Sequence, residues 1–453
     1  MFEFHAATSR RSFLSVGGPG LLAGTAWDSL ASEIPAEHQA RTFGQVKSVI
    51  FVTLYGGPPQ TDTFDMKPDA PVEARGPFKP IPSSVVDLHV CEHLPRLSRK
   101  MHLGTLARTL SHTDTAHGAS LYTHLTGWPH RINNQNFPSS PDDHPHYGAI
   151  VSKLRPPQSA GVPASVIVGG RILPQFKGIG QTAGYLGKGH APFVLNDQLR
   201  HLLASRPELT RIRVDRRQRL LTSLQQQARV FDQQQPSVNY GTVQERAMRL
   251  LGSENFIPAF DVSRERESTR LNYGKTPMGR YLLLARRLVE AGVPVIQISD
   301  IPVGGEQHWD LHYANIFDRL KKTLLPPLDQ SLSALLDDLE ERGLLDSTLV
   351  ICGGEFGRTP WLDHISNPPA GGRQHWPHCY SLFLAGGGIR RGQVFGKSDE
   401  LAAYPLSKKV GPWDLGATTL HLMGIDPHAQ VSDRDGQPRA ICRGDVVEEW
   451  IGS

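Results

Sequence analysis

The chain has 453 residues, 39% of them hydrophobic and 20% charged, a composition typical of a soluble globular protein with a large core and not of a disordered one. A net charge of only +4, with no long basic run, argues against nucleic-acid binding. The four cysteines lie far apart and form no CxxC pair, which excludes zinc-ribbon and thioredoxin-type motifs, so we expect mostly buried thiols.

Residues 1–36 have the pattern of an export leader. Arg10 and Arg11 precede Phe13 and Leu14, followed by a weakly apolar, Gly-rich stretch and small residues near Ala31. This pattern looks like the signal of the twin-arginine translocase, which exports folded proteins, so we expect that translocase as a partner and a periplasmic or extracellular location. An ordinary basic tail is the alternative. No other segment has eighteen or more consecutive apolar residues, so no membrane span is predicted.

Six short apolar runs, bounded by Gly and Pro, predict strands that are buried on both faces of a sheet. They are Ser48–Tyr55, His102–Ala107, Ser165–Val168, Val293–Ser299, Thr348–Cys352 and Ser381–Ala385. Between them, Arg280–Ala291 is an amphipathic helical segment that ends at Gly292, and Ile316–Arg342 is another that ends at Gly343. This alternation predicts an α/β fold with three α/β/α layers around a largely parallel central sheet.

Residues 196–276 differ from the rest of the chain. This segment is rich in Gln and Arg and has few β-branched runs, so we expect a helical insertion. It would lie within one α/β domain that spans residues 45–430, followed by a C-terminal tail over 431–453.

Polar side chains gather where the predicted strands end, which is where ligands bind in open parallel sheets. Five strand ends carry carboxylates or imidazoles. They hold Asp62, Thr63 and Asp65; the stretch 111–131 with His112, His117, His124 and His130; Asp300, His308, Asp310 and His312; Glu355 and Arg358; and Arg373, His375 and His378. A lone Asp after a strand is most often a turn or cap residue. Repetition at five ends favours one shared site, where mixed Asp, Glu and His ligands suit zinc, manganese, iron or calcium.

Six motifs, in order, resemble the bacterial domain-of-unknown-function family 1501, which is classed as sulfatase-like within the alkaline phosphatase superfamily. The motifs are GGPPQTDTFDMKP, HGASLYTHLTG, YGKTPMGRYLLLARRLVEAGVPVIQI, WDLH, GEFGRTP and GGRQHWPHCYSLFLAGGGI, and the resemblance covers Gln45 to Pro427. It implies an alkaline phosphatase-like fold and a divalent metal ion such as zinc, manganese or calcium. It also implies ester chemistry on a small-molecule or glycan substrate, although the family's own reaction is not established.

The resemblance to sulfatases does not extend to the catalytic nucleophile. Residues 125–127 and 129–131 look like the end of the sulfatase signature, and counting back places His117 where the catalytic Cys or Ser stands. Histidine cannot be converted to formylglycine, so the usual sulfatase mechanism is not expected.

The metal ligands also depart from the pattern of the superfamily. Glu355 matches a metal-binding Asp, but Phe356 replaces a metal-binding His, and Asp62 lies six residues after the paired glycines that stand where a sulfatase has paired Asp ligands. Asp310 with His312 resembles the Asp/His ligand group of the phosphatases, and His375 resembles the last His ligand.

The leading hypothesis is a metal-dependent hydrolase of phosphate or sulfate esters. Its predicted metal ligands are Asp62, Asp310, His312, Glu355 and His375. Arg358 and Arg373 would bind the non-bridging oxygens of the ester. The attacking group would be water at the metal, Thr63, Thr113 or His117, and a ligand or acid/base role is favoured for His117. The alternatives are a catalytically inactive protein that binds anionic glycans and a structural partner in an envelope assembly.

Overall fold

The computed structural model describes residues 42–452, apart from 135–136, 160, 174–177, 198, 201–249, 251–252, 254, 301–308, 313–314 and 363–370. Every described residue belongs to one compact unit, residues 41–453. The predicted leader, His308 and much of the predicted insertion therefore lie outside the described residues. Within the described residues, no helix is both long enough and apolar enough to cross a membrane.

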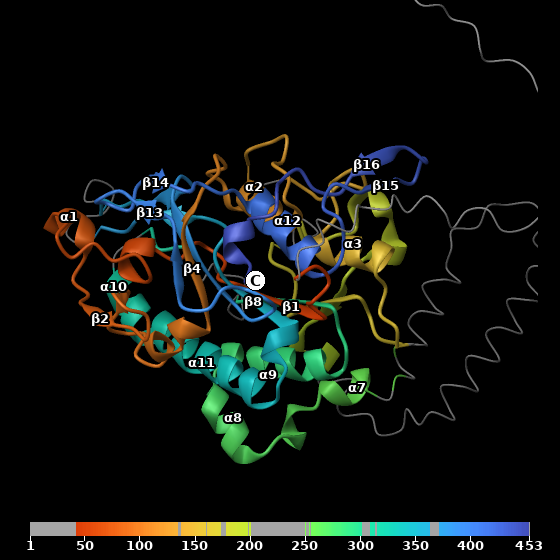
Figure 1. Cartoon of the computed structure of the whole chain (residues 1–453), viewed down its shortest axis with the longest axis horizontal. Coiled ribbons are helices and arrows are strands. Elements are labelled where there is room, and N and C mark those ends of the chain that lie inside the picture. Colours follow the sequence, from red (N-terminus) through yellow and green to blue (C-terminus); the bar gives the residue numbers. More distant parts are fainter. Residues whose placement is uncertain are drawn as a thin grey trace, which may run out of the picture. The chain divides into compact units, whose positions relative to one another are not determined.

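The centre of the described part is an eight-stranded sheet (Figure 1). Its strands follow the order β12–β4–β11–β8–β1–β7–β5–β6. Their bounds are β1 Ser48–Thr53, β4 Gly104–Leu110, β5 Ser165–Val168, β6 Phe193–Leu195, β7 Val295–Ser299, β8 Thr348–Gly353, β11 Tyr380–Ala385 and β12 Gln393–Phe395. All six predicted strand runs are found among them.

The prediction of a largely parallel sheet is confirmed. Only β11 runs antiparallel to its neighbours, β4 and β8, while the other pairings in this sheet are parallel. Between β8 and β11 the chain forms a short two-stranded ribbon, β9 (Gly357–Arg358) with β10 (His375–Trp376). The described residues of this connection include no crossover helix, and the chain returns beside β8 in the opposite direction.

Helices cover both faces of the sheet, as predicted. Helices α9 (Pro277–Glu290) and α11 (Leu325–Glu341) lie on one face, and α3 (Tyr147–Leu154) and α12 (Pro412–Leu422) lie on the other, where α12 also contacts α2 (His117–Thr126) (Figure 1). Side chains of β1 alternate between these two layers. Ile50 and Val52 pack with α9 and α11, while Val49 and Phe51 pack with α3 and α12.

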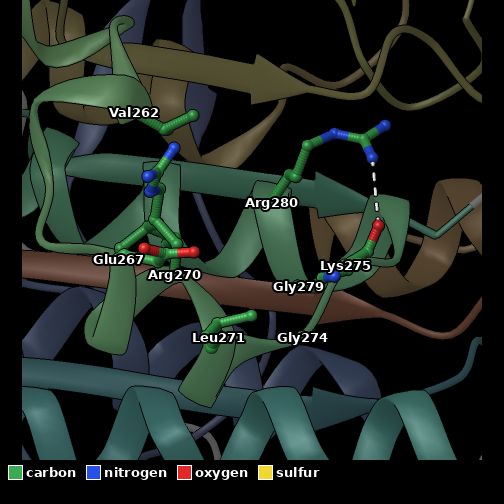
Figure 2. A pocket seen from close by; sticks show the side chains of 9 residues that line it. Val262, Glu267, Arg270, Leu271, Gly274, Lys275, Gly279 and Arg280 are labelled. Carbon is green, nitrogen blue, oxygen red and sulfur yellow. Dashed lines mark hydrogen bonds between the residues drawn. The ribbon is translucent and has the colours of Figure 1, made fainter.

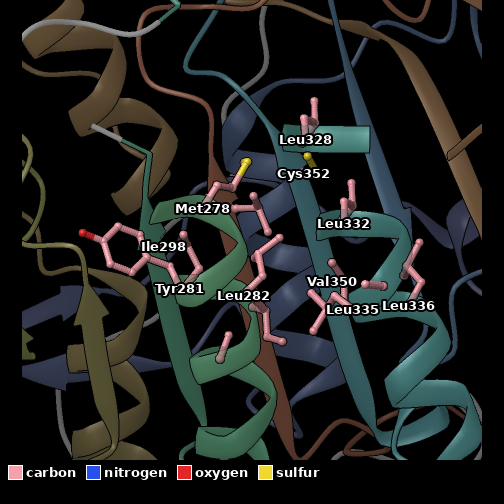
Figure 3. Close-up of a cluster of buried hydrophobic side chains, with 14 of the residues drawn as sticks. Met278, Tyr281, Leu282, Ile298, Leu328, Leu332, Leu335, Leu336, Val350 and Cys352 are labelled. Carbon is pink, nitrogen blue, oxygen red and sulfur yellow. The ribbon is translucent and has the colours of Figure 1, made fainter. Parts of the chain in front are cut away.

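The core under α9 and α11 is built from leucines at helical spacing (Figure 3). Residues of α9 and α11 pack there against Ile298, Val350 and Cys352 of the sheet. The Thr276 side chain caps α9 by accepting a hydrogen bond from the Gly279 N–H, and Pro277 occupies its first turn, where a missing N–H costs nothing. The predicted helix 316–342 is divided into α10 (Ile316–Arg319), a π-helical turn (Leu320–Leu324) and α11. Two prolines at the start of α11 lack the N–H groups that a continuous α-helix would need.

Shorter elements complete the described part. They are α1 Val72–Arg75, β2 Pro80–Pro82, β3 His89–Cys91, α7 Phe256–Ala259, α8 Glu267–Tyr273, β13 Lys397–Ser398, β14 Pro405–Ser407, β15 Gln430–Ser432 and β16 Pro438–Ala440. Helices α7 and α8 fall within the predicted insertion. In the predicted tail, Trp450 is fully buried against the core beside α12. All four cysteines are buried and unpaired, as expected.

Candidate metal centre

Four predicted residues from three separate parts of the chain meet in one cluster. His117 is the first residue of α2, Asp310 and His312 lie in the segment that follows β7, and His375 lies in β10. The ligand atoms of these four residues all lie within 4.8 Å of one another. Asp310 is central, because its Oδ1 lies 3.2 Å from His117 Nε2, 2.7 Å from His312 Nε2 and 3.3 Å from His375 Nε2. This convergence of side chains from different strand ends is what an open parallel sheet favours.

Each histidine of the cluster is held by its other ring nitrogen. His117 Nδ1 lies 2.7 Å from Glu355 Oε1, His312 Nδ1 lies 2.6 Å from Gln374 Oε1, and His375 Nδ1 lies 2.6 Å from the Thr115 carbonyl oxygen. Oxygens of these types only accept hydrogen bonds, so each Nδ1 carries a proton and Nε2 is the ring nitrogen that faces the cluster. The Nε2 atoms of His312 and His375 lie 2.8 Å apart. Metal-binding histidines typically donate their outer N–H in this way.

The Nε2 atom of His117 provides a test of whether a cation fits. It is buried and has no hydrogen-bond partner among the described residues, although the Asp310 carboxylate lies 3.2 Å away. A buried lone pair without a donor is costly, and a cation at the shared point would satisfy it. Three imidazoles and one carboxylate suit zinc, manganese or iron better than calcium, which takes six to eight oxygens. The four side chains therefore fit a divalent metal ion of the nitrogen-binding type.

The charges of the cluster favour an ionised Asp310. Burial alone would raise its pKa, but close contacts with the three histidines and the charge of Arg358 hold the pKa far below its usual range. Burial lowers the pKa of His375, whereas for His117 the contacts with Asp310 and Glu355 outweigh burial and raise the pKa. A fixed negative charge thus lies within 3.3 Å of three imidazole nitrogens.

Glu355, a predicted metal ligand, lies behind His117. Both of its carboxylate oxygens accept from the Gly56 N–H, at 3.0 and 3.1 Å, and Oε1 also meets His117 Nδ1. It is fully buried and acts on the cluster through the imidazole. Gly56 has φ +113°, and a Cβ there would lie 2.4 Å from the Asp310 backbone nitrogen. Only glycine allows this close approach between the end of β1 and the ligand loop.

Asp62, another predicted ligand, is paired with Arg373. The Arg373 guanidinium donates to both carboxylate oxygens of Asp62, at 2.7 and 3.0 Å, and both side chains are fully buried. Burial raises the pKa of Asp62, and the charge of Arg373 opposes that rise. Arg373 also donates to the carbonyl oxygens of Ala74, Thr359 and Pro360. The structure thus places Asp62 in an ion pair and not among the four converging ligand atoms.

Arg358 and Thr63 also contact protein groups. The Arg358 guanidinium donates to the carbonyl oxygens of Gly56, Gly57, Trp309 and Arg373 and to the Asp310 carboxylate. It therefore ties the loop after β1 to the ligand loop. The Thr63 hydroxyl donates to the Pro59 carbonyl at 2.8 Å.

Sequence reasoning did not identify Gln374, Thr115 or Gly56 as parts of this site. The paired glycines after β1 were visible as a departure from the sulfatase pattern, and they were the available signal for a close backbone approach. Gln374 and Thr115 act through one oxygen each, and no residue pattern distinguishes them from ordinary loop residues.

A separate pocket of about 310 Å³ lies at α8 and the start of α9 (Figure 2). It is lined by Val262, Glu267, Arg270, Leu271, Gly274, Lys275, Gly279, Arg280 and Leu283. Arg280 Nη1 donates to the Lys275 carbonyl at its rim, at 3.4 Å. None of the predicted site residues lines this pocket, so it is distinct from the metal centre.

Comparisons with known proteins give one family match and several remote structural likenesses. Residues 46–451 match the family described as "Protein of unknown function (DUF1501)". No curated protein matches the sequence. The Ps i-CgsB protein, crystallised with k-i-k-neocarrahexaose, is 12% identical with a TM-score of 0.40, covering 84% of this chain and 72% of that one. The PsFucS1 sulfatase from Pseudoalteromonas sp. is 13% identical (TM-score 0.34; 83% and 68% covered), and the phosphonate monoester hydrolase SpPMH from Silicibacter pomeroyi is 12% identical (TM-score 0.36; 90% and 76% covered).

Proposed function

The chain belongs to the DUF1501 family, and from that premise we propose that it is a metal-dependent hydrolase of phosphate or sulfate esters with a divergent active site. The observation that carries the proposal is the convergence of His117, Asp310, His312 and His375, with each imidazole held from behind by an acceptor. A bound divalent ion would screen the anionic ester and stabilise charge on the attacking and leaving oxygens.

In this proposal, the predicted residues take different roles. His117 is a metal ligand, because Glu355 orients its ring and its buried Nε2 faces Asp310. Glu355 and Arg358 are positioning residues that hold His117 and Asp310, respectively. Arg373 and Asp62 form a structural ion pair. The negative charge of the substrate is then compensated mainly by the metal ion and not by Arg358 and Arg373.

The test is metal content and turnover measured on the same preparations. The purified protein is stripped with a chelator, reloaded with zinc, manganese, iron or calcium, and assayed against phosphate monoesters, phosphate diesters and sulfate esters. We expect a bound metal ion and turnover that both disappear in Asp310→Asn. The exposed Asp318→Asn serves as the matched control and keeps both. A metal-loaded protein that hydrolyses none of these esters would overturn the hydrolase.

A non-catalytic binding protein for anionic glycans is the second candidate. It is favoured by His117, which stands at the sulfatase nucleophile's position with Nδ1 engaged by Glu355. Binding of sulfated or phosphorylated glycans by the metal-loaded protein, with no turnover of any ester, would favour this candidate. A hydrolysis rate that is lost in His117→Ala would exclude it.

We also propose export by the twin-arginine route, on the strength of Arg10 and Arg11 in the N-terminal segment. Replacing both with Lys is expected to keep the protein inside the cell without changing its metal content. Fractionation of cells that express the two forms measures this, and equal export of both forms would contradict the route.

A further inference from the structure

The pocket at α8 and the start of α9 has firmly anchored walls. The two helices approach each other so closely that a Cβ on Gly279 of α9 would overlap the carbonyl oxygen of Tyr273 at the end of α8. The Tyr273 hydroxyl donates to the Asp338 carboxylate of α11 at 2.9 Å, and the Gln330 side-chain amide of α11 donates to the Leu271 carbonyl at 3.0 Å. Because α8 is tied to both neighbouring helices, the cavity of about 310 Å³ is part of the folded structure, and its volume falls within the range of small-molecule sites.

Part of the pocket wall is apolar. Val262, Leu271 and Leu283 all line the cavity, and they come from the turn before α8, from α8 and from α9. Leu283 is almost fully buried, whereas Leu271 is 46% exposed. A single exposed leucine is ordinary on a protein surface, but this one lies in a concave wall beside two other apolar side chains. The wall can therefore cover the hydrocarbon portion of a small ligand.

The charged side chains of the pocket are mainly cationic. Arg270, Lys275 and Arg280 line it together with one carboxylate, that of Glu267 (Figure 2). Arg280 has protein neighbours, because it donates to the Lys275 carbonyl and its Nη2 lies 4.0 Å from the Asp197 carboxylate. The side chains of Arg270 and Lys275 have no ion-pair partner within the described part of the chain. Positive charge therefore exceeds negative charge around this cavity.

Other arginines of α9 are paired with carboxylates. Arg286 contacts Glu265 at 2.7 Å, Glu290 at 2.5 Å and Asp338 at 2.8 Å, and Arg287 also contacts Glu265. This network joins the turn before α8 to α9 and α11, but its carboxylates make no ion pair with the two unpaired cations of the pocket. An exposed cation is normally only hydrated, yet these two line a cavity that also has an apolar wall. That combination of groups matches a ligand with an acidic end and an apolar body.

We propose that this pocket binds a small organic anion, whose acidic group is held by Arg270 and Lys275 and whose apolar body packs against Val262, Leu271 and Leu283. A guanidinium binds such acidic groups through paired hydrogen bonds, and an ammonium group binds them as a point charge. The first turn of α9 also lines the pocket, and the dipole of this helix favours negative charge at that end. The site is separate from the metal centre and does not depend on the proposed hydrolase activity.

The test uses two fluorescent probes that differ in charge. Anilinonaphthalene sulfonate is an aromatic anion, and phenylnaphthylamine has the same rings without the sulfonate. We expect the purified full chain to bind the sulfonate more tightly than the neutral probe and to lose that preference as the salt concentration rises. Equal affinity for both probes, or no binding of the sulfonate, would overturn the proposal. The affinity should be the same before and after the metal is stripped with a chelator, and loss of binding on stripping would place the anion at the metal centre instead.

Substitutions of opposite sign locate the binding site. Replacing Arg270 and Lys275 together with Gln should weaken sulfonate binding roughly fivefold or more, whereas Glu267→Gln removes the opposing charge and should strengthen it. All three side chains are exposed, so the fold and the midpoint of thermal unfolding should be kept. Arg264→Gln is the matched control, because Arg264 is exposed in the turn before α8 but does not line the pocket. Unchanged binding in the double variant, or an equal loss in Arg264→Gln, would overturn the proposal.

Discussion

Glu355 and Asp62 are both buried carboxylates that follow predicted strands, yet their neighbours give them different roles. Glu355 accepts from an imidazole and from one backbone N–H, so its charge is transmitted to the metal centre through His117. Asp62 faces a guanidinium, and that pair satisfies both charges internally. At the scale of single residues, the partner of a buried carboxylate determines its role: an imidazole partner connects Glu355 to the metal centre, and a guanidinium partner makes Asp62 part of a structural ion pair.

For Glu355 we predict an effect on metal affinity. Glu355→Gln keeps the shape of the side chain but removes the charge that orients His117, and the loss of such a partner typically weakens metal binding 10–100-fold. The dissociation constant is measured by competition with a chelating indicator. The exposed Glu341→Gln on α11 is the control and should bind metal as before. Unchanged affinity in Glu355→Gln would show that this hydrogen bond does not support the metal centre.

For Asp62 we predict a loss of stability without a loss of metal affinity. Asp62→Asn leaves the buried Arg373 without its counter-charge, and breaking a buried pair in this way costs about 3–5 kcal/mol. The free energy of unfolding in urea should fall by an amount of that order, while metal affinity in the folded protein stays the same. Loss of metal at full stability would instead make Asp62 a ligand.

At the scale of elements, the loop after β1 controls how closely the strand ends approach one another. Gly56 adopts φ +113°, and any Cβ there would overlap the backbone at Trp309 and Asp310. Gly343 adopts φ +65° after α11, where a Cβ would meet nothing within 4 Å. A side chain at Gly343 would therefore meet only backbone strain, whereas a side chain at Gly56 would meet both backbone strain and steric overlap.

We expect Gly343→Ala to lower the stability by about 1 kcal/mol, the cost of placing a side chain in the left-handed region. Gly56→Ala should lower it by a larger amount and also weaken metal binding, because the Asp310 loop must move. Thermal unfolding and metal titration of both variants measure this. Equal effects of the two substitutions would mean that the loop after β1 tolerates displacement.

The elements of the fold could largely be predicted from the sequence, whereas the contacts within the site could not. Runs such as 48–55 and 348–352 are apolar throughout, a pattern that favours strands buried on both faces and does not depend on distant residues. The polar residues at the ends of these strands then predicted the region of the metal centre, and His117, Asp310, His312 and His375 do meet there. The pairing of Asp62 with Arg373 joins residues 311 positions apart, and no local pattern reports such a distant partner.

At the scale of the whole molecule, buried neutral histidines make the fold sensitive to acid. His124 and His146 are fully buried, and burial lowers the pKa of each to about 4, compared with about 6.5 in an unfolded chain. Between these values the unfolded state binds more protons, so stability falls as the pH drops below about 6.5, and the loss is complete near pH 4. Each histidine contributes on the order of 3 kcal/mol to this loss.

Urea unfolding of the metal-free protein at pH 7.5, 6 and 5 measures this dependence. We expect the free energy of unfolding to decrease steadily over this series and the decrease to be smaller in His124→Gln, which cannot take up a proton. An identical slope below pH 6.5 in both proteins would show that His124 is not kept neutral by the fold.

The hydrogen bond between His117 and Glu355 has a consequence for how this site can change by mutation. If a Cys or Ser replaced His117, the buried Glu355 carboxylate would lose its ring partner and keep only the Gly56 N–H. If position 355 changed first, the imidazole would lose its orienting acceptor. Each single step is therefore disfavoured, and an evolutionary path between a nucleophile and a histidine at position 117 requires paired substitutions. Among homologous sequences, positions 117 and 355 should accordingly vary together.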